Sequence, residues 1–221
     1  WSYRCADERC CPAEGRPLPE TASAFVAEAT YAGVVALPDR AALAATLDPV
    51  PREQRDALEP LIAAHENAAV QAVLEGGWLR MERAGKRAIF AAARRADAAD
   101  CAGVRLNADD TARFGVLLSG VELRDAVWLA VDDRRLDGRE LWRELARGLP
   151  EPYNAGAFFL YGWASWRAGN GALATMAAER TLASDPAYSA ADLLLEALRR
   201  GIDPRRMPRL RGTRSAAARP A

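Results

Sequence analysis

The sequence predicts a mostly α-helical protein, and three observations support this prediction. From residue 21 onward alanine is very common and runs of valine and isoleucine are few, a composition that favours helix over strand. Apolar residues recur at steps of three and four, the spacing that places them on one face of a helix. Proline and glycine are concentrated where such segments would begin or end.

Helix starts are marked by side chains that can accept hydrogen bonds from free backbone N–H groups. Asp39 and Asn107 each precede a segment with helical periodicity. Asp137, with Glu140 three residues later, has the form of a capping box. Pro60 is expected to kink or split the long helical segment that begins near residue 51.

Residues 155–201 carry the clearest helical pattern. Gly169 ends the first helix, Asn170 caps the second, and Pro186 ends it before Ser189 caps a third. The first helix has a continuous face that we expect to be buried against neighbouring helices; it consists of Ala155, Phe158, Phe159, Gly162, Trp163 and Trp166.

This helical hairpin resembles a tetratricopeptide unit. With Ala155 as the first position of the 34-residue repeat, Gly162, Ala174 and Pro186 fall on its characteristic glycine, alanine and proline. No second copy in register precedes it, so we expect one such unit with a capping helix and not a repeat array.

The two ends of the chain together resemble a known family. The stretches "WSYRCADERCCPAEGRPLP" and "GWASWRAGNGALATMAAERTLASDPAYSAADLLLEAL" are similar to the actinobacterial domain of unknown function 4192. Members of that family carry a further N-terminal α/β half before the Trp-Ser-Tyr motif. The resemblance therefore implies that this chain is the C-terminal part of a larger protein, and it brings no activity with it.

The sequence divides into four predicted regions. Residues 1–20 form a short strand and a turn rich in cysteine and proline, which belong to the truncated N-terminal domain. Residues 21–152 form a helical region. Residues 153–202 form the tetratricopeptide-like hairpin and its capping helix. Residues 203–221 form a basic disordered tail.

Three cysteines lie close together near the start of the chain. Cys5, Cys10 and Cys11, completed by the distant Cys101 or by His65, would supply the four ligands of a zinc site. The paired C-x-x-C of a zinc knuckle is absent, however, and nothing indicates the oxidising compartment that a disulfide needs. We interpret the cysteines as reduced structural thiols and expect no cofactor; a metal site and a redox centre are the alternatives.

Other candidate catalytic residues are few. His65 is the only histidine, and no partner motif surrounds it, so we interpret it as a helix-surface or core-edge residue. The pairs Asp109-Asp110 and Asp132-Asp133 are expected to be solvated and structural, since adjacent residues seldom converge on one ligand. We identify no catalytic residue, and we favour a non-enzymatic protein over an enzyme.

Charge is balanced overall but unevenly placed. The chain has 30 basic and 30 acidic residues. Six arginines and no acid follow Asp203, so residues 1–203 carry a net charge of −6. An arginine-rich tail can attract nucleic acid, but the acidic remainder opposes this, and we expect no binding at physiological ionic strength.

The leading hypothesis for function is a non-catalytic helical module that binds another protein in the cytoplasm. No apolar stretch is long enough to cross a bilayer, so we expect no membrane association. One alternative is a metal-dependent or enzymatic protein whose site is completed by the missing N-terminal half. A second alternative is nucleic-acid association through the arginine-rich tail. The sequence leaves the oligomeric state open.

Overall fold

The computed structural model describes residues 28, 37–98 and 105–210. The chain separates into two compact units, residues 1–42 and 43–221. Of the first unit the structure describes Glu28 and residues 37–42. The predicted strand and cysteine-rich turn of residues 1–20 lie outside the described residues. The architecture below is that of the second unit, together with residues 39–42, where the first described helix begins.

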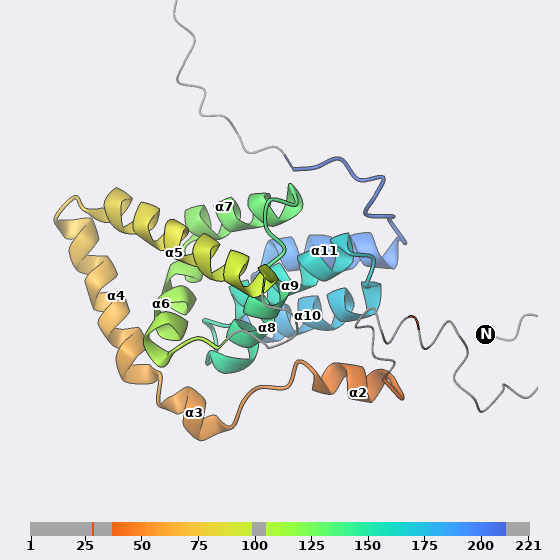
Figure 1. Ribbon diagram of the computed structural model, residues 1–221, viewed down its shortest axis with the longest axis horizontal. Coiled ribbons are helices and arrows are strands. Elements are labelled where there is room, and N and C mark those ends of the chain that lie inside the picture. The colour runs from red at the N-terminus through yellow and green to blue at the C-terminus, as the bar shows by residue number, and fades with distance from the viewer. Residues whose placement is uncertain (1–27, 29–36, 99–104, 211–221) are drawn as a thin grey trace, which may run out of the picture. The chain divides into compact units, whose positions relative to one another are not determined.

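All regular elements within the described residues are helices, which confirms the mostly α class (Figure 1). In chain order they are α2 (Arg40–Ala45), α3 (Arg52–Asp56), α4 (Glu59–Leu74), α5 (Trp78–Ala98), α6 (Ala108–Ser119), α7 (Val121–Asp132), α8 (Arg139–Gly148), α9 (Ala155–Arg167), α10 (Gly171–Ser184) and α11 (Ser189–Arg199).

Local capping fixes several of the predicted helix starts. The carboxylate of Asp39 accepts a hydrogen bond from the backbone N–H of Ala42 at 2.7 Å. The side chains of Asn107 and Asn170 cap α6 and α10 in the same way. Pro60 lies in the first turn of α4, where its missing N–H leaves no bond unmade, so it separates α3 from α4 as expected.

The predicted capping box of α8 is wrong. The residue before the helix is Gly138, with a left-handed φ of 63°, and Asp137 pairs with Arg139 instead of capping. The cap comes from α5, where the carboxylate of Asp97 accepts the backbone N–H of Gly138 at 2.6 Å. The prediction for Ser189 is also wrong, because it is the first residue of α11 and Tyr188 precedes it as the cap residue.

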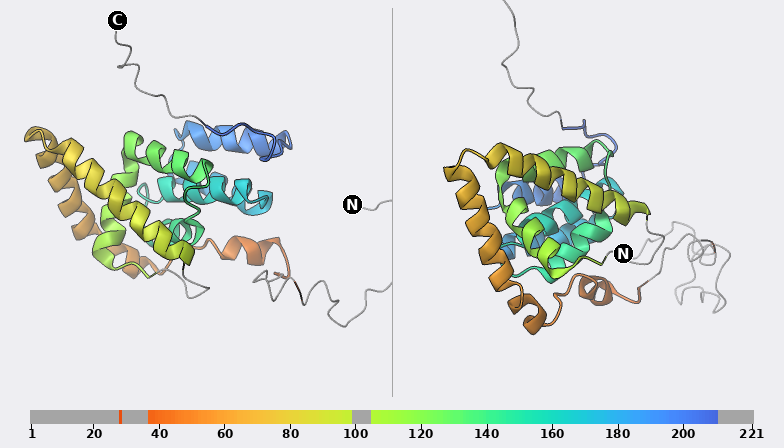
Figure 2. Two further views of the ribbon diagram at one scale, coloured as in Figure 1. Left: turned by 45° about the horizontal axis from the view of Figure 1, so that its top comes forward. Right: turned by 60° about the vertical axis from the view of Figure 1, so that its left-hand side comes forward.

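Helix α9 lies at the centre of the second unit, with α6, α7, α8, α10 and α11 all packed against it. The predicted aromatic face is buried, but it is only part of the buried surface. Every residue from Ala155 to Trp166 is buried. A helix that is apolar on all sides is expected to be surrounded, and Figure 2 shows α9 enclosed by its neighbours.

Small residues allow α9 and α10 to approach closely. A Cβ atom added at Gly162 would lie 3.2 Å from the Cβ of Ala177 and 3.3 Å from the backbone oxygen of Ala174. The two helices therefore approach closely at Ala174 and Ala177. Because both helices present small side chains at this crossing, their backbones fix the orientation of the hairpin.

Candidate functional site

The four cysteines considered as metal ligands, Cys5, Cys10, Cys11 and Cys101, all lie outside the described residues. Within the described residues, no group of three or more His, Cys, Asp or Glu side chains is arranged to hold a metal ion. His65, the other candidate ligand, lies on α4 and has a different partner.

His65 contacts the first turn of α6. Its Nε2 lies 3.0 Å from the Oδ1 of Asp109, a partner that the sequence does not indicate because it is 44 residues away. The next residue, Glu66, accepts a hydrogen bond from the hydroxyl of Tyr153 at 2.6 Å. This bond raises the pKa of Tyr153 to about 12. Both contacts tie α4 to the rest of the unit, which is a structural role.

The second aspartate pair differs from the prediction. The sequence predicts a solvated Asp132, yet this residue is 1% exposed at the end of α7. Its Oδ1 accepts hydrogen bonds from the indole N–H of Trp163 at 3.0 Å and from the Nε of Arg167 at 2.6 Å. A buried carboxylate needs partners of this kind, because the cost of removing it from water must be offset.

Arg167 joins this carboxylate to the segment that follows α11. Its guanidinium donates to the backbone oxygen of Pro204 at 2.6 Å and to that of Met207 at 3.2 Å. The second oxygen of Asp132 accepts the backbone N–H of Leu210 at 2.6 Å. The structure describes the predicted basic tail as far as Leu210, and residues 204–210 are held here by a buried ion pair.

Aromatic rings cover the same ion pair. The guanidinium carbon of Arg167 lies 5.5 Å from the ring centre of Trp163 and 5.4 Å from that of Trp166. These are distances at which a cation is attracted to an aromatic face. The two indole rings meet edge to face, with their centroids 5.0 Å apart. Trp163 therefore has two roles, as a core side chain and as a hydrogen-bond donor to Asp132.

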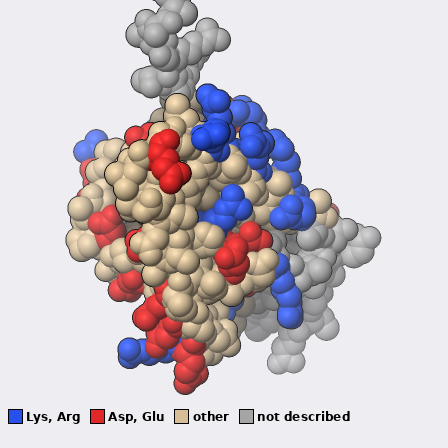
Figure 3. Space-filling model, turned by 90° about the vertical axis from the view of Figure 1, so that its left-hand side faces the viewer, with Lys and Arg blue, Asp and Glu red and all other residues tan. Residues whose placement is uncertain are grey.

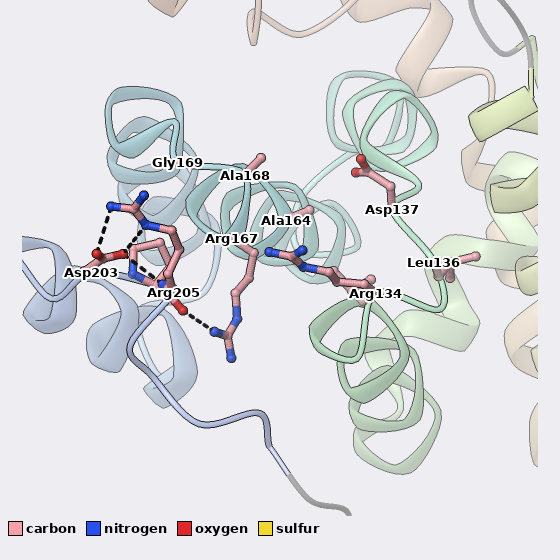
Figure 4. A pocket seen from close by; sticks show the side chains of 11 residues that line it. Arg134, Leu136, Asp137, Ala164, Arg167, Ala168, Gly169, Asp203 and Arg205 are labelled. Carbon is pink, nitrogen blue, oxygen red and sulfur yellow. Dashed lines mark hydrogen bonds and ion pairs between the residues drawn. The ribbon is translucent and has the colours of Figure 1, made fainter.

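A groove of about 790 Å³ lies beside the ion pair. The end of α9, the loop between α7 and α8 and residues 203–205 form its walls (Figure 4). Arg205 donates two hydrogen bonds, of 3.1 and 3.0 Å, to the carboxylate of Asp203. Arg139 donates a hydrogen bond to the carboxylate of Asp137. Most charges of the groove are thus neutralised within the protein, so the groove offers few groups for chemistry.

Helix α4 exposes an uncharged surface on the side away from its buried one. Ile62 is the only residue of α4 that is fully buried. We define the outer face of α4 as Ala63, Asn67, Val70 and Leu74, which are all exposed and are spaced at four, three and four residues. Such spacing places them on one side of the helix.

Large apolar side chains gather where α4 turns into α5. We define the α4–α5 tip as Val70, Val73, Leu74 and Leu79, which are 55%, 59%, 74% and 61% exposed. Figure 3 views the molecule from the side on which α4 lies and shows an extended uncharged area there, with acidic and basic side chains scattered around it. Large apolar side chains are thus exposed next to one another at this end of the two helices.

The outward side of α5 is basic. We define the basic stripe of α5 as Arg80, Arg83, Arg87 and Arg94, which are all exposed and lie away from the buried residues of that helix. None of these four arginines forms an ion pair with another residue that the structure describes. Lys86 and Arg94 also flank the Phe90 ring at 5.7 and 6.0 Å.

These features define a helical protein in which buried polar contacts secure the fold, while the exposed surface of α4 and α5 has no partner among the described residues. The chain belongs to the family described as domain of unknown function DUF4192, which matches residues 1–205. A search of the curated proteins found no match, and a search of the solved structures found none either. Within the described ranges, every helix is too short or too polar to span a membrane.

Proposed function

We propose that this protein is a non-catalytic helical module that binds another protein through α4 and α5. The outer face of α4 carries the proposal. The solvent side of a helix is usually charged or polar. The outer face of α4 has no charged residue, although the exposed Glu59 and Glu66 flank it, and α4 packs on α5 and α6 with its other side. Val70 and Leu74 remain more than half exposed. Association would remove this apolar area from water, which is favourable.

The α9–α10 hairpin supports the proposal by analogy. We propose that it is a tetratricopeptide-like unit, because Gly162 meets Ala174 and Ala177 at the position where that repeat uses small residues. Hairpins of this type usually present surfaces to other proteins, and this step is an analogy of fold. The proposal includes a cytoplasmic location.

Site-specific photo-crosslinking in the native host tests the function. A photoreactive amino acid at Leu74 should give protein adducts that Val70→Glu abolishes. The matched control is Leu193 on α11, which is 69% exposed and lies away from this surface. Adducts formed equally at both positions, or at neither, would refute the interaction module.

A further inference from the structure

We propose that the partner is a second copy of this chain, with α4 of each copy packed on α5 of the other. This inference rests on the proposed function and adds the identity of the partner. Its basis is a division of charge between two adjacent helices. α4 and its C-cap contain no lysine or arginine, whereas α5 exposes the basic stripe, which has no acidic partner among the described residues.

Three acidic side chains are exposed along α4 and its C-cap: Glu59, Glu66 and Glu75. Glu59 and Glu66 are seven residues apart, the spacing that places two side chains on nearly the same side of a helix. The hydroxyl of Tyr153 donates to the Oε1 of Glu66, and the Oε2 of Glu66 has no donor among the described residues. The carboxylate of Glu66 can therefore accept a second hydrogen bond from a partner.

The basic stripe repeats the same interval. Arg80, Arg87 and Arg94 on α5 also recur every seven residues and are exposed. Seven residues correspond to about 10.5 Å along a helix. An acidic row on α4 and a basic row on α5 thus have equal spacing, so more than one pair of opposite charges can meet when the two helices lie side by side.

The positions of the two rows also match when counted from the turn that joins the helices. Glu66 precedes Gly76 by ten residues, and Arg87 follows Gly77 by ten. Glu59 precedes Gly76 by 17 residues, and Arg94 follows Gly77 by 17. Each glutamate therefore lies about as far from the turn as one arginine of the stripe.

This match is the one that two-fold symmetry requires. α4 and α5 diverge from their shared turn (Figures 1 and 2). A two-fold axis that runs parallel to the bisector of the angle between them, displaced to one side of the plane that holds both helices, lays α4 of one copy along α5 of the other, with the two tips together. Residues at equal distances from the turn then face one another, and each contact occurs twice. Glu59 faces Arg94 of the second copy, and Glu66 faces Arg87.

The alternative pairings bring like charges together. Packing α4 on α4 would place glutamates against glutamates, and packing α5 on α5 would place arginines against arginines. Like charges across an interface are unfavourable. Among these arrangements of two copies, α4 on α5 alone opposes acids and bases.

The apolar and charged parts contribute differently. Val73, Leu74 and Leu79 supply the apolar area that drives association. The charges extend along the helices from this tip and select the partner and its orientation. A nucleic acid on the basic stripe would account for the arginines alone. It would leave the outer face of α4 uncovered and place phosphates near its glutamates, so the second copy explains more of the surface.

Charge reversal tests the pairing directly. One variant carries Glu59→Arg and Glu66→Arg on α4, and the other carries Arg87→Glu and Arg94→Glu on α5. All four positions are exposed, so both variants should fold, which circular dichroism checks. Sedimentation equilibrium of the full chain should show a dimer. Each variant alone should dimerise at least about tenfold more weakly, because like charges then face each other.

Two control variants isolate the interface from the rest of the protein. Tyr153→Phe removes the internal hydrogen bond to Glu66 but leaves the charge of Glu66 in place, so this variant should dimerise like the wild type. Leu193→Glu adds a charge on α11, away from the surface, and should also have no effect. Weak dimerisation of Tyr153→Phe would assign the loss in the α4 variant to the broken internal bond and would contradict the pairing.

Mixing the two reversal variants provides the decisive measurement. In the mixed dimer each α4 again faces an α5 of opposite charge, so an equimolar mixture should form a heterodimer at wild-type strength. A chain carrying all four substitutions should likewise recover dimerisation. Recovery in both cases supports the α4-on-α5 pairing, since a general loss of stability would not be repaired by mixing.

Three results would overturn the inference: that the wild-type chain is a monomer at all concentrations, that the dimer is insensitive to the reversals, or that the variants fail to recover on mixing. A wild-type monomer that binds a labelled oligonucleotide through α5 would assign the stripe to nucleic acid instead. If the chain is monomeric while Leu74 crosslinks to a different protein, the second copy is excluded but the interaction module stands. If Leu74 crosslinks to nothing, both proposals fail.

Discussion

The carboxylate of Asp132 on α7 and the guanidinium of Arg167 at the end of α9 form an ion pair at 2.5 Å whose side chains are 0% and 10% exposed. The two residues are 35 positions apart in the sequence. Through this pair, two core helices and the segment after α11 are fixed to one another. Its role is structural, and it is open to direct measurement.

Removing one partner of this pair should destabilise the protein strongly. Asp132→Asn leaves Arg167 without its buried counter-charge, and we expect a loss of about 3–5 kcal/mol in the free energy of unfolding. The matched control is Asp133→Asn, because Asp133 pairs with the exposed Arg135 at 3.1 Å. That substitution should cost at most about 1 kcal/mol. Urea denaturation measures both.

A second readout concerns the segment that the pair holds. In Asp132→Asn, trypsin should cleave after the exposed Arg206 and Arg209 faster than in the wild type, because residues 204–210 lose their anchor. Equal losses of stability in the two aspartate variants, with unchanged cleavage, would contradict the assigned role of Asp132.

Trp163 is 3% exposed and packs against Trp128 and Trp166 at ring distances of 5.0 Å. Trp163→Ala should lower the free energy of unfolding by about 3–5 kcal/mol, the usual loss for a large buried aromatic side chain. Leu193→Ala, on the exposed side of α11, should change it by less than about 0.5 kcal/mol. A loss below about 1 kcal/mol at Trp163 would be inconsistent with a packed aromatic core.

Alanine substitutions at Gly138 and Gly169 distinguish the stability cost of backbone strain from that of a steric clash. Both have left-handed φ angles, 63° and 88°. An added Cβ at Gly138 would lie 2.7 Å from the Trp142 indole, whereas none of the described atoms lies within 4 Å of one at Gly169. Gly169→Ala should cost about 1–2 kcal/mol, from the backbone alone. Gly138→Ala should cost roughly a further 1–3 kcal/mol for the clash. Thermal unfolding of the two variants compares them; equal costs would show that Trp142 moves freely.

The hydrogen bond from Tyr153 to Glu66 gives an alkaline pH dependence with a defined sign. The hydroxyl donates only when protonated, so the bond raises the pKa of Tyr153 from 10.0 to about 12. Its contribution to stability is complete below pH 10.0 and is lost as the pH rises through about 12. The ultraviolet absorbance of tyrosinate, as the difference between wild type and Tyr153→Phe, follows this titration.

Glu66→Gln removes the charge and leaves an acceptor. In that variant the pKa of Tyr153 should fall towards 10.0, because the carboxylate is the main cause of the rise. A titration of Tyr153 that is identical in the two proteins would show that the contact with Glu66 is not maintained in solution.

Local interactions are readable from the sequence. The Asn107 amide accepts the N–H of Asp110 at 2.7 Å and the Asn170 amide that of Leu173 at 3.2 Å, each only three residues ahead. The separation of α3 from α4 at Pro60 likewise depends on one residue and its own turn. Helix content and several helix ends are thus determined by short stretches of sequence, because the interacting groups are neighbours in the chain.

The contacts of Asp132 were decided by tertiary structure. In the sequence Asp132 is one of two adjacent polar residues at a helix end, and its partners Trp163, Arg167 and Leu210 lie 31, 35 and 78 residues away. No local pattern encodes such distances. The cap that α8 receives from Asp97, 41 residues before Gly138, is hidden from the sequence for the same reason.

The surface of α4 shows the same division. Its sequence determines a helix with apolar residues on more than one side, since Ile62 and Leu74 lie about 120° apart around the axis. Which side is covered depends on where α5 and α6 pack, and this arrangement leaves Leu74 74% exposed. Helix periodicity is a property of consecutive residues, whereas burial is a property of the whole packed chain, so only the tertiary structure could separate the core of α4 from its free surface.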